Sequence, residues 1–351
     1  MTQFPAGPAA VLDETVPALI RAGGDGGAAL GRAVPAFLGP EDVELDVTLC
    51  GLCGSDIVVY VGDPEFAWVR PGTVLGHEAV GVVAEAGLLV PEDFTPGTRV
   101  VPVSGIGCGS CEACRTDYGQ GCPQQVILGL NRHGAAAARC TVPARNLVAV
   151  PDHVPDETAV LTEPASVAWR AVAVTGRVRA GERVAVSATR AIGLLAALQA
   201  QSFGAEVTLV VRPEPKYDAR RALAADLGLA VDAAPAPGSV DVWIEATGTG
   251  RHLELGMRAL RPGGRMIPVA MYSDSSRRPA TITVRPDVTV RPSYASSKAD
   301  YVNALAFLAG IPDIGARLVT PYPLTDALAA LHDSTYGRTD GTQLIKAALR
   351  P

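Results

Sequence analysis

Residues 183–211 read RVAVSATRAIGLLAALQAQSFGAEVTLVV. Positions 183–186 form a short apolar run of the kind found in buried strands, positions 194–198 are apolar throughout as in a packed helix, and 207–211 form a second strand-like run. Two parallel strands need a long crossover between them, and this crossover is usually a helix. The stretch therefore predicts a strand–helix–strand unit of a parallel sheet.

The same alternation continues downstream of this unit. A helix fits residues 217–227, strands fit 240–246 and 265–269, and a turn fits 259–264, where Pro262 is followed by two glycines. Strands that alternate with helices are typical of α/β proteins with a doubly wound parallel sheet. We therefore predict an α/β domain in this part of the chain.

The segment before the predicted α/β domain has a different residue pattern. Between residues 43 and 150, short β-branched runs such as 43–47 and 80–83 alternate with Gly/Pro turns, and no long helix is evident. This pattern predicts a small barrel-like β domain. Residues 1–40 fit loops and short strands.

The last part of the chain is expected to rejoin the β domain. From about Val290 the sequence fits a helix at 300–309 and a terminal strand near 343–347. A chain of 351 residues exceeds what one hydrophobic core usually holds, so two domains are expected.

The composition excludes several classes of protein. Hydrophobic residues make up 48% and charged residues 19%, which is ordinary for a globular chain. A formal net charge of −6 and the lack of any Lys/Arg block argue against a nucleic-acid partner. The apolar runs are too short for a membrane span, and no basic start precedes an apolar stretch at the N-terminus. We expect a cytoplasmic protein that acts on a small molecule.

Four of the seven cysteines stand close together in a Gly-rich loop. Cys108, Cys111, Cys114 and Cys122 have the spacing C-x2-C-x2-C-x7-C. Four thiolates at such short spacing can close a tetrahedron around zinc. The alternative is an iron–sulfur cluster, which also uses short cysteine spacings. With no open coordination position, the predicted zinc would hold the loop rather than react.

A second set of metal donors comes from separate turns. Cys53 offers a thiolate, His77 an imidazole and Glu163 a carboxylate. Three protein ligands that leave the fourth position open are the pattern of a catalytic zinc. Such a metal can polarise a carbonyl or lower the pKa of a bound alcohol. We therefore expect two zinc ions per chain, one catalytic and one structural.

Three polar residues beside these donors are candidates for catalytic roles. Asp56 could accept a hydrogen bond from the second ring nitrogen of His77 and fix its tautomer. Ser55 is placed to pass a proton. Glu78 could replace a departing ligand, or it could be a carboxylate that only supports the ligands.

The order of these motifs resembles one known family. Cys53-Gly54-Ser55-Asp56, then Gly76-His77-Glu78, the four-cysteine loop and Glu163-Pro164 are similar to zinc-dependent medium-chain alcohol dehydrogenases, above all to the sorbitol and threonine dehydrogenase branch. The resemblance covers roughly residues 40–351. It implies a GroES-like, β-rich catalytic domain (1–152 and 290–351), a Rossmann domain (153–289), and a homodimer or homotetramer.

The resemblance also assigns roles to individual residues. Cys53, His77 and Glu163 match the ligands of the catalytic zinc, and Ser55 matches the hydroxyl of a proton relay. The histidine that often continues this relay is Val58 here. Protons would then need water or another route.

The glycine fingerprint of a Rossmann domain is degenerate in this chain. The motif uses glycines for a tight turn, for close approach to the diphosphate and for packing of the helix on the strand. Ala188 and Arg190 occupy the first two glycine positions, and only Gly193 remains. Two further family glycines are Ala270 and Pro292 here. The charge of Arg190 would attract phosphate if the loop were remodelled.

The end of the second strand bears on the choice of cofactor. An acidic residue there would bind the ribose of NAD, but the chain has Val211 followed by Arg212. This favours NADP over NAD. Ala246, the last residue of the predicted strand at 240–246, and Thr247 after it are further candidates for cofactor contacts.

Two functions remain open at this point. The first is a zinc-dependent oxidoreductase that transfers a hydride between NADP(H) and a small alcohol or ketone, such as a polyol, an amino alcohol or a sugar-like compound. The second is a redox-neutral zinc enzyme, a lyase, isomerase or cyclase, that has lost the dinucleotide. They differ in whether a nicotinamide cofactor binds.

Overall fold

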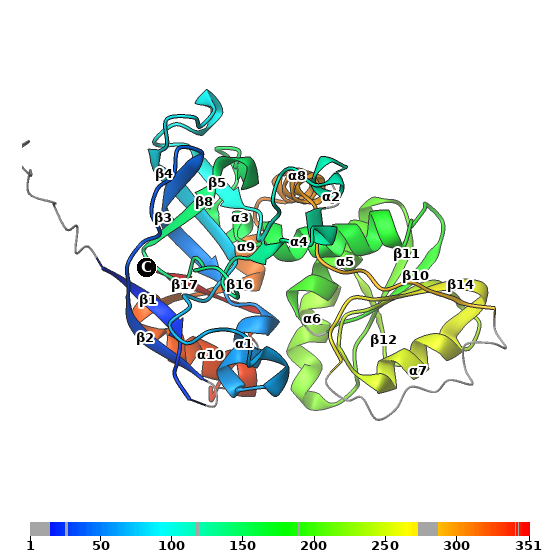
Figure 1. The fold of residues 1–351 in the computed structure, drawn as a ribbon. Coiled ribbons are helices and arrows are strands. Elements are labelled where there is room, and N and C mark those ends of the chain that lie inside the picture. Colours follow the sequence, from blue (N-terminus) through cyan, green and yellow to red (C-terminus); the bar gives the residue numbers. More distant parts are fainter. Residues whose placement is uncertain are drawn as a thin grey trace, which may run out of the picture.

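The strand–helix–strand unit at 183–211 lies at the centre of a six-stranded parallel sheet (Figure 1). The structure is a computed structural model, and it describes residues 15–24, 27–116, 119–188, 190–272, 287–340, 342 and 344–351. The sheet has the order β12-β11-β10-β13-β14-β15. Its strands are β10 (Arg183–Ser187), β11 (Glu206–Val210), β12 (Ala230–Asp232), β13 (Val240–Glu245), β14 (Leu260–Pro268) and β15 (Thr289–Val290).

Three helices connect these strands: α5 (Ala191–Ser202), α6 (Asp218–Asp226) and α7 (Gly250–Ala259). The strands are apolar on both faces because both faces are covered, so Val184, Val186 and Ile244 are all fully buried. The predicted doubly wound α/β fold is confirmed.

One predicted turn was wrong. Residues 259–264 were expected to precede the fourth strand, but β14 already begins at Leu260. The pairing with β13 shifts register between Val240 and Val242, and Gly263 has φ +76. Glycine adopts this left-handed conformation without strain, so the strand continues through an irregularity that looks like a turn in the sequence.

The second sheet has seven strands in the order β16-β17-β3-β4-β5-β9, with β8 paired to β3. A separate hairpin, β1 (Val16–Arg21) and β2 (Ala28–Ala33), and a two-stranded β6–β7 sheet, Gly105–Ile106 with Val126–Ile127, belong to the same part of the chain. The strands of the large sheet are β3 (Asp42–Gly51), β4 (Glu78–Ala86), β5 (Arg99–Pro102), β8 (Arg139–Pro143), β9 (Leu147–Ala149), β16 (Val319–Pro323) and β17 (Lys346–Arg350).

The C-terminal segment returns to this sheet as expected. Strand β17 pairs with β3, and helices α8 (Lys298–Ala309), α9 (Ile314–Leu318) and α10 (Ala327–Tyr336) precede it. The terminal strand was predicted near 343–347. It instead starts at Lys346 and runs to Arg350, and residue 343 lies outside the described part of the chain.

Short helices complete the β-rich part and join it to the parallel sheet. Helix α1 (Gly54–Val61) has eight residues and α2 (Glu112–Arg115) has four, in line with the expected lack of a long helix there. Helices α3 (Asp156–Ala159) and α4 (Thr162–Trp169) follow, and α4 packs on both α5 and α8. Within the described residues, every helix is too short or too polar to cross a bilayer.

Candidate metal and cofactor sites

The four cysteines of the Gly-rich loop form one tight cluster. The Sγ atoms of Cys108, Cys111, Cys114 and Cys122 all lie within 4.8 Å of one another. Helix α2 begins directly after Cys111 and carries Cys114, and this turn brings the two sulfurs together. The backbone N–H and the hydroxyl of Ser110 lower the pKa of Cys108 to about 5. Four thiol groups, one of them held as a thiolate, suit a closed zinc site.

A second cluster of donors lies where α1 meets β4. Cys53 precedes α1, His77 precedes β4, and Glu78 is the first residue of β4. One donor atom from each of these three residues lies within 4.8 Å of the other two. Glu78 rather than the predicted Glu163 thus completes the tightest set of donors.

Glu163 approaches the same cluster from α4. Its carboxylate and the Cys53 thiolate both act to raise the pKa of His77 well above its usual value, against the effect of burial. Burial raises the pKa of Glu163 itself to about 7. Glu163 therefore lies close enough to His77 to interact with its charge, and its role as a zinc ligand stays a prediction.

Glu78 is held by a lysine that the sequence reasoning missed. The Nζ atom of Lys346, on β17, lies 2.7 Å from Oε1 and 2.5 Å from Oε2 of Glu78, and it donates to the carbonyl of Leu52 at 3.1 Å. All these groups are buried. The position of Lys346 within the apolar run of the terminal strand was the signal in the sequence that could have indicated a buried ion pair. Because Lys346 contacts both carboxylate oxygens, binding of a metal by Glu78 would compete with this ion pair.

The predicted hydrogen bond between Asp56 and His77 was wrong. The carboxylate of Asp56 accepts from the backbone N–H of Cys53 at 2.8 Å and of Gly76 at 3.1 Å. It thus ties the start of α1 to the turn that carries His77. The Nδ1 atom of His77 is buried and has no partner among the described residues. One of these backbone donors lies at the N-terminus of α1, where N–H groups lack helical partners, and the other lies in the turn before β4.

The unpartnered ring nitrogen is consistent with a metal ligand. A buried imidazole nitrogen without a hydrogen bond is costly unless something else binds it. The Oγ atom of Ser55 is also buried and unpartnered. An orphaned hydroxyl beside the donors fits the predicted proton relay, and Val58, one turn along α1, cannot extend it.

A serine and a tyrosine that were not predicted support Glu163. Ser104 Oγ lies 3.5 Å from Glu163 Oε1, and the Tyr301 hydroxyl donates to Ser104 Oγ at 3.1 Å. Tyr301, on α8, is fully buried. The three residues are far apart in the sequence, so no local pattern indicated that they meet.

The turn that the resemblance assigns to nucleotide binding lies between β10 and α5. A Cβ atom on Gly193 would lie 1.9 Å from the Cβ of Ala188, so only glycine allows α5 to pack this closely on the strand end. Arg190 caps α5, and its Nη2 donates to the carbonyl of Ser334 on α10. The fingerprint thus keeps its packing glycine, while its phosphate-facing glycine is an arginine.

The end of β13 carries a buried carboxylate that the sequence reasoning also missed. Glu245 accepts from the backbone N–H of Thr247 at 2.8 Å and of Gly248 at 3.2 Å, and from the hydroxyls of Ser187, Thr247 and Tyr272. These contacts place Ala246 and Thr247 beside the end of β10. Their predicted contact with a cofactor stays a prediction.

Arg212 follows β11 and forms part of an aromatic and cationic cluster. It donates to the hydroxyl of Tyr217, and its guanidinium lies 4.6 Å from the centre of that ring. Arg220, on α6, lies 5.4 Å from the same ring centre. The Nε atoms of Arg212 and Arg220 are buried and unpartnered. Arg220 was missed, although its spacing of three residues from Tyr217 places both on one side of the chain.

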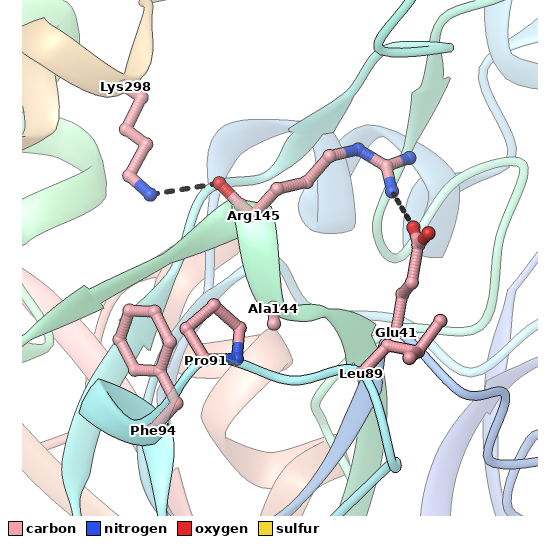
Figure 2. A pocket seen from close by; sticks show the side chains of 7 residues that line it. All are labelled: Glu41, Leu89, Pro91, Phe94, Ala144, Arg145 and Lys298. Carbon is pink, nitrogen blue, oxygen red and sulfur yellow. Dashed lines mark hydrogen bonds and ion pairs between the residues drawn. The ribbon is translucent and has the colours of Figure 1, made fainter.

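Two surface cavities lie away from all these residues. Figure 2 shows the first, of about 230 Å³, where Phe94, Pro91 and Ala144 form an apolar wall and Arg145 pairs with Glu41. The second, of about 580 Å³, lies between the end of α5 and α9. Neither contains a predicted site residue, so neither is the candidate site.

Comparisons with known proteins agree with this architecture. The family model of the alcohol dehydrogenase GroES-like domain matches residues 39–152, and the model of the zinc-binding dehydrogenase matches residues 191–310. L-Threonine 3-dehydrogenase of Pyrococcus horikoshii is 32% identical over 250 residues, which are 67% of this chain and 70% of that protein. L-Threonine 3-dehydrogenase of Chelativorans sp. is 35% identical over 216 residues, which are 60% of each chain, less than two thirds of that relative's length.

Solved structures share the whole fold. Alcohol dehydrogenase TADH from Thermus sp. ATN1 has a TM-score of 0.80 and 28% identity, and the match covers 95% of this chain and 99% of that one. A zinc-binding dehydrogenase from Sinorhizobium meliloti, solved with bound NADP, has a TM-score of 0.84 at 24% identity, covering 97% and 100%. At that identity the second likeness concerns the fold alone.

A parallel sheet beside a β-rich part with two sets of metal donors is the architecture that this chain shares with these dehydrogenases. The chain belongs to the zinc-dependent medium-chain alcohol dehydrogenase family. The predicted family and fold are confirmed, and nothing in the comparisons supports the redox-neutral alternative.

Proposed function

We propose that this protein is a zinc-dependent oxidoreductase that transfers a hydride between NADP(H) and a small alcohol or ketone. The observation that carries the proposal is the closeness of two sites on different domains. Arg190, at the turn before α5, donates to the carbonyl of Ser334 on α10, and α10 packs against α1, which begins directly after Cys53 of the metal-donor cluster. A substrate bound at the donors would therefore lie next to a cofactor bound at the turn.

The chain's own residues have distinct roles in this proposal. Cys53, His77 and Glu163 would hold the catalytic zinc, which when bound supplies a Lewis acid for the substrate oxygen. The Ser55 hydroxyl takes up or releases the proton of that oxygen. Because Val58 cannot carry the proton further, it leaves through water. Cys108, Cys111, Cys114 and Cys122 would hold the structural zinc.

The substrate class rests on the relatives named above. A polyol, an amino alcohol or a sugar-like compound fits a branch whose matched members include threonine dehydrogenases. We also propose domain limits of 1–152 with 290–351 for the catalytic domain and 153–289 for the Rossmann domain. Seven free cysteines suit a reducing compartment, so we propose the cytoplasm.

Arg212→Ala is expected to weaken NADPH binding about 10- to 100-fold and to leave NADH binding unchanged. The guanidinium stands at the end of β11, where a ribose 2′-phosphate would lie, and charge-assisted hydrogen bonds to phosphate contribute about 1.5–3 kcal/mol. Calorimetric titration with both cofactors measures the difference. A preference of the wild-type protein for NADH would contradict the proposed cofactor, and binding of neither would contradict the proposed oxidoreductase.

We further propose a homodimer or homotetramer that uses the β15 edge of the parallel sheet, an edge that no other described strand pairs with. Strand β15 ends the sheet with Val290 44% exposed, and Tyr294 beyond it is 65% exposed. An exposed strand edge pairs readily with another chain. Val290→Asp is therefore expected to lower the oligomeric state in sedimentation velocity. Leu88→Asp, at an exposed residue of the other domain, should leave it unchanged; equal sedimentation of both variants would refute this interface.

A further inference from the structure

Arg190 stands where the family fingerprint has a glycine that lets the backbone approach a diphosphate. Its side chain leaves the turn between β10 and α5 and reaches the last turn of α10, on the other domain, where it donates to the carbonyl of Ser334. Among the described residues, this is the one hydrogen bond that the Arg190 side chain makes. The guanidinium carries five N–H groups, so most of its donors stay available.

Arg190 lies near two further guanidinium groups, those of Arg212 and Arg220, which share the ring of Tyr217. Burial, together with the charges of Arg190 and Arg212, lowers the pKa of Arg220 to about 10. The carboxylate that pairs with the cluster within the described residues is Glu214, 3.6 Å from Arg212. Like charges held together in a partly buried site are unfavourable unless an anion neutralises them. The cluster is thus built for a ligand with more than one negative group.

The positions of the three arginines match two separate parts of such a ligand. Strands β10 and β11 are neighbours, and Ser187 pairs with Val210, so Arg190 and Arg212 follow adjacent strand ends. In a Rossmann domain the diphosphate lies at the first strand end and the adenosine ribose at the second. Arg190 is therefore at the diphosphate position, and Arg212 with Arg220 is at the ribose position.

We propose that Arg190 binds the diphosphate of the dinucleotide, so that a guanidinium replaces the backbone contact that glycine would allow in this turn. The proposal rests on the proposed cofactor. A phosphate oxygen is a stronger acceptor than the single neutral carbonyl of Ser334, so the side chain exchanges one for the other when the cofactor binds. Arg190 then contacts the diphosphate, which NADPH and NADH share, whereas Arg212 and Arg220 contact the 2′-phosphate, which only NADPH has.

The test is calorimetric titration of the zinc-loaded protein with NADPH, NADH and ADP-ribose, which has the diphosphate but no nicotinamide. Arg190→Ala is expected to weaken all three by the same factor, about 10- to 100-fold. Arg190→Lys should recover only part of the loss, because lysine cannot bind two phosphate oxygens in a fork. Arg258→Ala, at an exposed arginine of α7, is the matched control and should change nothing. Circular dichroism checks that each variant is folded.

Three results would overturn the role of Arg190. The first is unchanged binding of the probes by Arg190→Ala, and the second is tighter binding by Arg190→Gly. The third is a loss of binding limited to NADPH, because this would place Arg190 at the 2′-phosphate. A wild-type protein that binds none of the three probes would instead remove the proposed cofactor, and the role of Arg190 with it. The behaviour of the wild type therefore separates the two failures.

Discussion

Cys53→Ala is expected to lower kcat/KM about a thousand-fold or more while the chain stays folded. Cys53 lies at the start of α1 beside His77, and its sulfur belongs to the donor cluster rather than to a hydrophobic core. Removing it leaves the predicted catalytic zinc with too few ligands, and the Lewis acid contributes several kcal/mol to the transition state. Steady-state rates, zinc content and circular dichroism on the same sample measure the effect.

Ser55→Ala is the comparison for this prediction. It removes the orphaned hydroxyl next to Cys53 but no metal donor, and water can take over part of a proton transfer. The expected loss is about 100-fold or less, with zinc content unchanged. Turnover that persists in a Cys53→Ala protein lacking the second zinc would contradict the proposed mechanism.

Cys111→Ser is expected to reduce the metal content from two zinc ions to one per chain and to destabilise the fold. The four sulfur atoms form a closed set, and the loop around them has little apolar surface of its own to bury. Loss of a structural metal is among the few single changes that cost about 3–5 kcal/mol or more. Elemental analysis and thermal unfolding measure both effects.

A neighbouring substitution controls for damage to the loop itself. Glu112→Gln lies next to Cys111, on an exposed residue that is not one of the four donors. It should keep both zinc ions and nearly the full stability. Iron in place of zinc, or an unchanged melting temperature in Cys111→Ser, would refute the structural-zinc assignment.

The sequence predicted those parts of the fold whose signals are local. Strand β10 is buried on both faces, so residues 184–186 appear as a continuous apolar run, and the four-cysteine loop is defined by its spacing alone. The start of β14 was misplaced because Pro262 and Gly263 look like a turn, although Gly263 permits an irregular strand. Strand β17 was predicted three residues too early, with Lys346 inside the predicted strand.

The site was less predictable, because its supporting contacts join distant segments. The ion pair between Glu78 and Lys346 spans 268 residues, and the bond between Tyr301 and Ser104 spans 197. The role of Asp56 was misjudged for a different reason. Its neighbour His77 was visible in the sequence, but the competing backbone donors at Cys53 and Gly76 appear only once the turn is folded.

The position of Lys346 on the last strand also has a consequence for how the protein is made. Glu78 leaves the ribosome long before its counter-ion, and at about 5–20 residues per second the interval of 268 residues lasts roughly 15–50 s. During that time β3 lacks its partner β17, and the carboxylate of Glu78, which is buried in the folded protein, lacks the ammonium group of Lys346. The β-rich sheet is therefore completed only after the strands and helices of the parallel sheet have been synthesised.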